Sequence, residues 1–206
     1  MDILDDYKKG ARYFELKNTI QSLDDLDSKV ENIKNIIESF FQFPSKEKWE
    51  KLETTLFILC EFSKFVDEKN FKKVLLEAEL LFKEDNEAFI FKGSILKNYL
   101  GSLNKYLNKN LGVEDCQIFL NDDSIFLTIT NRIKNLNLNS IDRFVCFEIL
   151  KIMITIFERD DDFESVKEKI KQNIDVIINN ILSKFQDELI FFQYFEGKIM
   201  TGKPRH

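Results

Sequence analysis

Histidine is almost absent from this sequence: the only one is His206, the last residue. Histidine is the commonest general base near neutral pH and a frequent metal ligand. A Ser/His or Cys/His nucleophile would therefore depend on the end of the chain, and a histidine-based zinc site is excluded. The sequence also lacks a Walker phosphate loop and a GxGxxG motif. It therefore shows no common catalytic constellation and predicts no cofactor.

Glycine and proline are scarce, with 6 and 2 residues in a chain of 206. Turns between short strands require these residues, so a many-stranded sandwich or barrel is not expected. The longest apolar runs, such as residues 189–192, are far shorter than the ~20 residues that a membrane-spanning helix needs. Hydrophobic residues make up 44% of the chain and charged residues 32%, as in globular proteins. Long helices with few interruptions fit this composition best.

Basic residues are outnumbered by acidic ones, and the net charge is −6. Nucleic-acid affinity comes largely from basic faces that neutralise phosphates, so general nucleic-acid binding is not expected. Cys60, Cys116 and Cys146 are widely spaced among large apolar residues, which predicts buried, reduced thiols. The first ten residues lack the apolar segment of a signal peptide. We expect a cytoplasmic protein, or an effector that a specialised secretion system delivers without a cleavable signal.

Helical periodicity runs through most of the chain. Residues 2–20 show it loosely, and apolar residues recur at steps of three and four through 26–41, after an Asp-rich start that suits the helix dipole. Ser45 is the expected N-cap of the next helix, with Pro44 packed against Trp49. Later helices are predicted over 70–84 and 87–109, after Ser140, over 166–185 and around 187–197. These elements amount to seven to nine helices.

Residues 116–130 are ambiguous. Two apolar runs rich in Ile, Phe and Thr flank Asn-Asp-Asp at 121–123, which could form a β-hairpin. A helix capped by Asp123 would instead align one continuous apolar stripe: Phe126, Ile129, Ile133 and Leu136. Because this stripe continues past the end of any hairpin, we favour the helix.

A short pattern recurs in the two halves of the chain. In each half an apolar helix is followed by an acidic turn, and the next helix begins with Phe-x-x-Val. The Phe-x-x-Val pairs are Phe71/Val74 and Phe163/Val166. A duplicated helix hairpin would produce this recurrence, and a chance match is the alternative. The predicted fold is a single all-α domain over 1–206, either an irregular multi-helix bundle or a short α-solenoid of HEAT-like hairpins. Its possible pseudo-repeat halves are about 22–110 and 113–198.

Glutamates recur every three residues at Glu47, Glu50 and Glu53 in the stretch SKEKWEKLETTLFILCEF. Helical nucleotide hydrolases can hold Mg²⁺ with carboxylates alone, so Glu47 and Glu50 form a candidate metal site. At about 100° per residue, however, Glu47 lies opposite the apolar stripe of its helix, which indicates a solvated first turn. From Phe57 onward the helix is apolar on all sides, which predicts that other helices cover both of its faces.

Acidic, helix-rich chains without catalytic groups typically bind another protein. We therefore expect a non-catalytic protein-binding module, either an adaptor or assembly subunit or an immunity- or antitoxin-type inhibitor whose acidic face meets a basic partner. The alternatives are a Mg²⁺-dependent helical nucleotide hydrolase using Glu47 and Glu50, and a secreted effector. Three acidic segments are candidate partner-binding sites: Asp24, Asp25 and Asp27; Asp122 and Asp123; and Asp160, Asp161 and Asp162.

Overall fold

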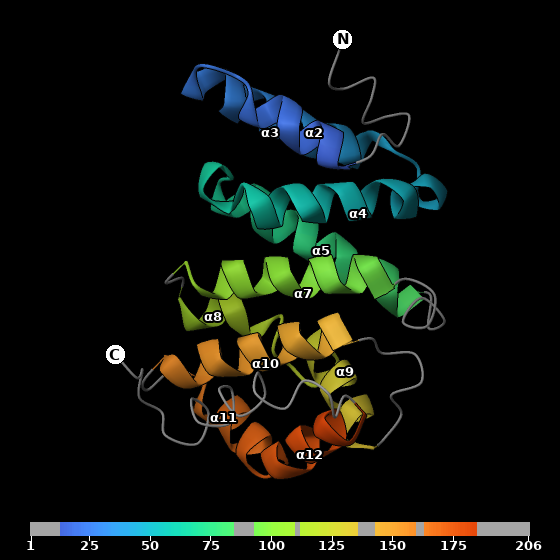
Figure 1. Cartoon of the computed structure of the whole chain (residues 1–206), viewed down its shortest axis with the longest axis vertical. Helices are drawn as coiled ribbons and strands as arrows, with labels where there is room; N and C mark the ends of the chain where they lie inside the picture. The colour runs from blue at the N-terminus through green and yellow to red at the C-terminus, as the bar shows by residue number, and fades with distance from the viewer. Residues whose placement is uncertain (1–12, 85–92, 110–111, 136–142, 160–162, 185–206) are drawn as a thin grey trace. The chain divides into compact units, whose positions relative to one another are not determined.

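The computed structural model describes residues 13–84, 93–109, 112–135, 143–159 and 163–184 (Figure 1). These residues contain ten α-helices, one short 3-10 helix and no strand, which confirms the all-α prediction. The helices are more numerous than the predicted seven to nine because a five-residue helix forms at 113–117 and because the helix expected over 166–185 is two helices. Within the described residues, no helix is long and apolar enough to cross a membrane.

The chain divides into two compact units, Met1–Asn86 and Glu87–His206. The prediction of a single domain with pseudo-repeat halves stays a prediction. The helices of the first unit are α2 (Tyr13–Gln21), α3 (Leu26–Gln42), α4 (Ser45–Glu61), η1 (Ser63–Phe65) and α5 (Glu68–Glu84). The helices of the second unit are α7 (Gly93–Leu107), α8 (Val113–Gln117), α9 (Ile125–Lys134), α10 (Arg143–Glu158), α11 (Glu164–Lys171) and α12 (Ile174–Lys184).

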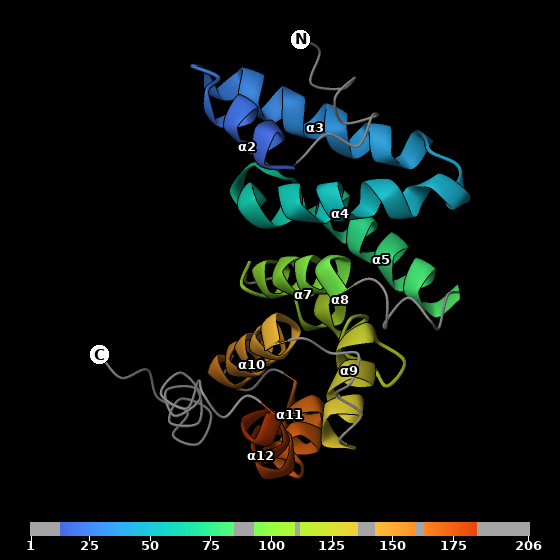
Figure 2. The same ribbon diagram turned by 45° about the vertical axis from the view of Figure 1, so that its right-hand side comes forward.

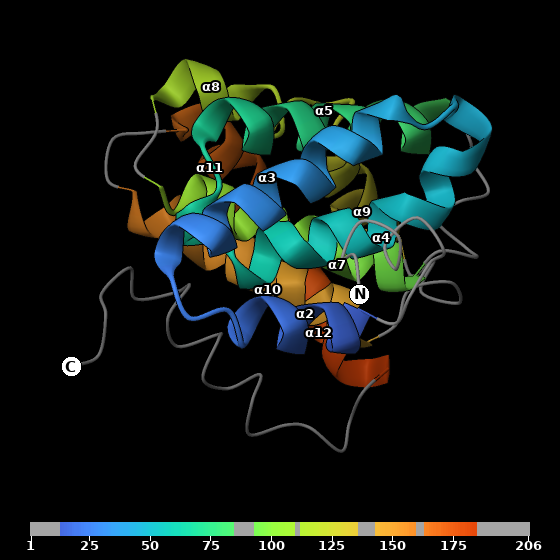
Figure 3. The ribbon, with the colours of Figure 1, turned by 90° about the horizontal axis from the view of Figure 1, so that it is seen from above.

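Helix α4 is the middle layer of the first unit. Helices α2 and α3 lie on one side of it and α5 lies on the other, and all three pack against it (Figures 1 and 2). Helix α2 also packs against α3, and seen from above the two helices diverge from the turn that joins them (Figure 3). In the second half of α4, Leu56, Ile58 and Leu59 are all fully buried although they point in different directions around the helix. The prediction that this half is covered on both faces is therefore confirmed.

The start of α4 differs from the sequence prediction. Its N-cap is Pro44, whose carbonyl accepts from the backbone N–H groups of Glu47 (2.9 Å) and Lys48 (3.2 Å), so Ser45 is already the first helical residue. At the other end the helix stops at Glu61, and Ser63–Phe65 forms the separate 3-10 helix η1. The predicted cap at Ser45 was thus wrong by one residue. The reason is that a proline with extended ψ can present the first carbonyl of a helix without a capping side chain.

Helices α7 and α10 pack along each other in the second unit, and α9 packs against α12 (Figure 2). Large side chains are buried around these helices, and the Tyr106 ring of α7 meets Phe119, which follows α8, edge to face with 5.6 Å between centroids. Thr155 of α10 donates a 2.7 Å hydrogen bond to Asn104 of α7, which satisfies two polar groups inside this interface. Cys116 and Cys146 are buried as predicted, whereas Cys60 of the first unit is half-buried.

Residues 125–134 form α9, so the helix interpretation of this region is confirmed. Phe126, Ile129 and Ile133 are buried on one stripe, and Leu136 lies outside the described residues. The cap, however, is Ser124, whose hydroxyl accepts from the Leu127 N–H at 3.3 Å. Asp123 lies one residue earlier, in a turn where its N–H donates to the Asn121 side chain. Because this turn occupies Asp123, the helix starts one residue later than predicted.

The two Phe-x-x-Val patterns occupy different positions relative to their helices. Phe71 lies inside α5, whereas Phe163 is the N-cap of α11 and has a left-handed φ of 62°. A left-handed backbone is uncommon for a bulky residue and persists only where neighbours hold it. Here the Arg159 guanidinium lies 4.9 Å from the centre of the Phe163 ring, and Lys167 donates to the Arg159 carbonyl at 2.7 Å.

Candidate functional site

The first acidic segment lies at the start of α3, where Asp24, Asp25 and Asp27 are all exposed. Asp25 is the N-cap of the helix, and its side chain accepts from the Ser28 N–H at 2.7 Å. Hydrogen bonds to Ser28 favour the ionised carboxylate and hold the pKa of Asp25 below its ordinary value. Asp25 therefore stabilises the helix start, while Asp24 and Asp27 have no comparable hydrogen bond within the described part of the chain.

Two apolar side chains are exposed beside these carboxylates. Leu26 is 58% exposed and Val30 is 37% exposed, and their spacing of four residues places them on one side of α3. The sequence had predicted that the buried stripe begins at Leu26, and that prediction was wrong for its first two members. Among the described residues, continuous burial of the α3 stripe starts at Ile33.

Carboxylates flank this apolar pair. Asp24, Asp27 and Glu31 are exposed, and none of them forms an ion pair within the described residues. Lys29 is the only basic residue between positions 24 and 31, and it is half-buried. We define the α3 acidic surface as the five exposed side chains Asp24, Leu26, Asp27, Val30 and Glu31. It combines an apolar centre with carboxylates that form no ion pair within the described residues.

Glu47 and Glu50, the candidate metal ligands, are exposed in the first turns of α4, and Glu53 is half-buried. Within the described ranges, no group of three or more His, Cys, Asp or Glu residues is placed to hold a metal ion. The structure instead places Glu47 and Glu50 next to Lys51, which is only 3% exposed. Burial lowers the pKa of Lys51, and the negative charges of Glu50 and Glu47 oppose that change. The negative charges of these two glutamates therefore partly offset the cost of burying Lys51.

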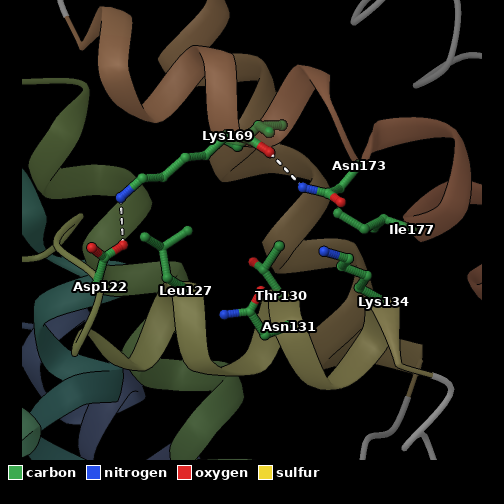
Figure 4. Close-up of a pocket in the computed structure, with 9 residues that line it drawn as sticks. Asp122, Leu127, Thr130, Asn131, Lys134, Lys169, Asn173 and Ile177 are labelled. Carbon is green, nitrogen blue, oxygen red and sulfur yellow. Dashed lines mark hydrogen bonds and ion pairs between the residues drawn. The ribbon is translucent and has the colours of Figure 1, made fainter.

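A pocket of about 130 Å³ lies in the second unit, between α9 on one side and α11 and α12 on the other (Figure 4). Asp122 is the predicted site residue that lines it, and its carboxylate forms a 2.5 Å ion pair with Lys169 across one edge. Asp123 is exposed and is not a lining residue. Asp160, Asp161 and Asp162 lie outside the described residues. The lining is formed by Asp122, Leu127, Thr130, Asn131, Lys134, Lys169, Ile170, Asn173 and Ile177.

Most lining residues of the pocket were not expected from the sequence. Lys134 lies on α9, Lys169 on α11 and Asn173 in the turn between α11 and α12, and none belongs to a motif with a local spacing. Only the packing of α9 against α12 brings them together. The one local signal was the acidic pair Asp122–Asp123, which lies in the turn before α9 that borders the pocket.

The chain matches no protein-family model, no curated protein and no solved structure. No relative of known activity therefore contributes to the assignment of function. The two candidate functional sites are therefore the α3 acidic surface in the first unit and the pocket in the second.

Proposed function

We propose that this chain is a non-catalytic protein-binding module and that the α3 acidic surface contacts a basic partner protein. The observation that supports the proposal is the exposure of Leu26 and Val30, at 58% and 37%, between three carboxylates without ion-pair partners in the described part of the chain. Protein interfaces commonly have an apolar centre and a polar periphery, and the α3 acidic surface has both on a small scale.

The apolar pair defines how such a partner would be recognised. Side chains four residues apart on one face of a helix are typical anchors of a helix that docks into a groove. Leu26 and Val30 have this spacing. Each Å² of apolar surface that the partner covers contributes roughly 25 cal/mol before the costs of association. The partner we infer has an apolar groove that accepts these two side chains.

The carboxylates of the α3 acidic surface indicate which side chains surround the partner's groove. Asp24, Asp27 and Glu31 favour lysine or arginine side chains on the partner, which speed association and fix the orientation of the complex. The segment at Asp122–Asp123 is less suited to this role because Lys169 already pairs with the Asp122 carboxylate. The proposal covers a cytoplasmic adaptor or assembly subunit and an inhibitor that masks the basic surface of a toxin or enzyme.

The test uses charge reversal with a matched control. The full chain is used to capture partners from the native cell, and the captured protein is purified and its affinity measured. Asp24→Lys/Asp27→Lys should weaken this affinity at least about tenfold, and so should Leu26→Ser. The control Glu114→Lys/Asp175→Lys makes the same charge change at exposed first-turn positions of α8 and α12 and should leave the affinity unchanged. Equal weakening by both double variants would contradict a local contact at α3.

A further inference from the structure

We propose that the pocket between α9 and the α11–α12 pair binds a small monocarboxylate with an apolar body. This inference is independent of the partner-binding proposal because it concerns the other unit of the chain. It rests on three observations: an ammonium group that faces the pocket and has no ion-pair partner among the described residues, an apolar lining, and hydrogen bonds that hold the walls of the pocket together.

The ammonium group belongs to Lys134, the last residue of α9. Its side chain points from α9 toward the space in front of Asn173 (Figure 4). Lys134 is half-buried, and no carboxylate in the described part of the chain forms an ion pair with it. The other lysine of the pocket, Lys169, is already paired with Asp122. One positive charge thus remains for a ligand, which favours a monoanion.

A lysine at a helix end often serves the free carbonyl groups of the last turn. Here Asn180 of α12 takes that role, because its side-chain amide donates 2.9 Å hydrogen bonds to the carbonyls of both Ile133 and Lys134. The Lys134 ammonium is therefore not required for capping. A half-buried lysine with no ion-pair partner in the described part of the chain is well placed to bind a ligand carboxylate, since charge-assisted hydrogen bonds are the stronger kind.

The lining also includes apolar side chains from three helices. Leu127, Ile170 and Ile177 line the pocket from α9, α11 and α12. A short hydrocarbon body would contact these side chains, whereas a bare inorganic anion would contact only the polar ones. The volume of about 130 Å³ is below the roughly 300–1,000 Å³ of pockets for drug-sized ligands, so the ligand is small.

The walls of the pocket are tied together without a ligand. The two Asn180 hydrogen bonds link α12 to the end of α9, and Asn173 donates a 2.8 Å hydrogen bond to the Lys169 carbonyl. The Asp122–Lys169 ion pair closes one edge. Such a framework reduces the ordering cost of binding, because little of the site must be arranged when the ligand enters.

The experiment titrates hexanoate into the isotope-labelled full chain in a carboxylate-free buffer and follows the amide resonances of Asn173 and Ile177. Saturable shifts are expected with hexanoate, whereas hexylamine, hexanol and inorganic phosphate should give none. Lys134→Met keeps the aliphatic stem and should weaken binding at least about tenfold. Lys134→Arg keeps the charge and should retain it, and Lys105→Met at an exposed position of α7 should leave it unchanged.

Four results would overturn the inference: no saturable shift with hexanoate, equal binding of hexylamine or hexanol, equal binding of phosphate, or unchanged affinity in Lys134→Met. If Lys134→Met does not fold, Lys134→Arg and the ligand series still decide. Loss of binding in Lys134→Arg would count against a charge-based site.

Discussion

Asp25 accepts a 2.7 Å hydrogen bond from the backbone N–H of Ser28, and this contact separates the carboxylates at the start of α3 into two kinds. Asp25 caps the helix, whereas Asp24 and Asp27 keep their charge exposed. The same acidic segment therefore stabilises the fold through one residue and presents negative charge through its neighbours.

Replacement of Asp25 should reveal its capping role through pH. Its pKa is lowered in the folded chain, so its stabilising effect is full above the ordinary value of 3.8 and is lost as the pH falls through the folded pKa. Asp25→Ala should therefore lower the melting temperature at neutral pH, and the difference from the wild type should shrink in strong acid. Thermal melts across pH measure this. Asp24→Ala is the control and should show no such pH-dependent loss.

Ser124 and Asp123 give a direct test of where α9 begins. Ser124 is fully buried and caps the helix, so Ser124→Ala should lower the free energy of unfolding by about 0.5–2 kcal/mol. Asp123 is exposed and does not cap α9, so Asp123→Ala should cost clearly less. Urea unfolding of the two variants provides the comparison. A larger loss for Asp123→Ala would mean that the helix starts at the residue expected from the sequence.

Asn180 should be a stability determinant of the second unit. Asn180→Ala removes hydrogen bonds to two carbonyls at the end of α9 and should lower the free energy of unfolding by about 1–3 kcal/mol. Hydrogen exchange should also rise along α9 and α12, because the tie between them is lost. Asn179→Ala, at the exposed neighbouring position, is the matched control. Similar exchange in both variants would argue against this tie.

Lys51 should be destabilising in its charged form. Burial lowers its pKa, which means that folding disfavours the protonated form of Lys51 relative to the unfolded chain. Lys51→Met keeps the stem and should raise the melting temperature. In the wild type, Glu47→Gln and Glu50→Gln should each lower it slightly by removing countercharge. In the Lys51→Met background these two substitutions should have no effect, and a double-mutant cycle measures this coupling.

Glu47 and Glu50 also test the alternative that the chain is a Mg²⁺-dependent hydrolase. If their role is to support Lys51, Mg²⁺ or Mn²⁺ with nucleotides should not raise the melting temperature. A clear metal-dependent rise that disappears in Glu50→Gln would favour the Mg²⁺-dependent hydrolase and contradict the non-catalytic proposal.

Much of the fold was predictable because it depends on local periodicity. The stripe at Phe126, Ile129 and Ile133 identified α9, and the all-round apolar half of α4 identified a covered middle helix. Helix ends were less predictable. Pro44 caps α4 through its backbone carbonyl alone, and the choice of Ser124 over Asp123 as the cap of α9 depends on the turn that precedes the helix.

The candidate sites depended on long-range packing. A periodic stripe shows that Leu26 is on the core side of α3 but not whether another helix reaches far enough to cover it. The pocket was still less visible, because Lys134 and Asn173 meet only through the packing of α9 against α12. Residue spacing within one helix does not show which residues of other helices will lie beside it.

The partner-binding proposal is tested most directly by the dissociation constant of the captured partner, measured for the wild type and for Asp24→Lys/Asp27→Lys at low and high salt. Between about 0.1 M and 1 M salt the screening length falls from about 10 Å to about 3 Å. The wild-type complex should weaken at least about tenfold over that range. The variant should already be weak at low salt and should lose most of the salt dependence. A salt-independent complex, or equal dissociation constants for the two proteins, would contradict the account.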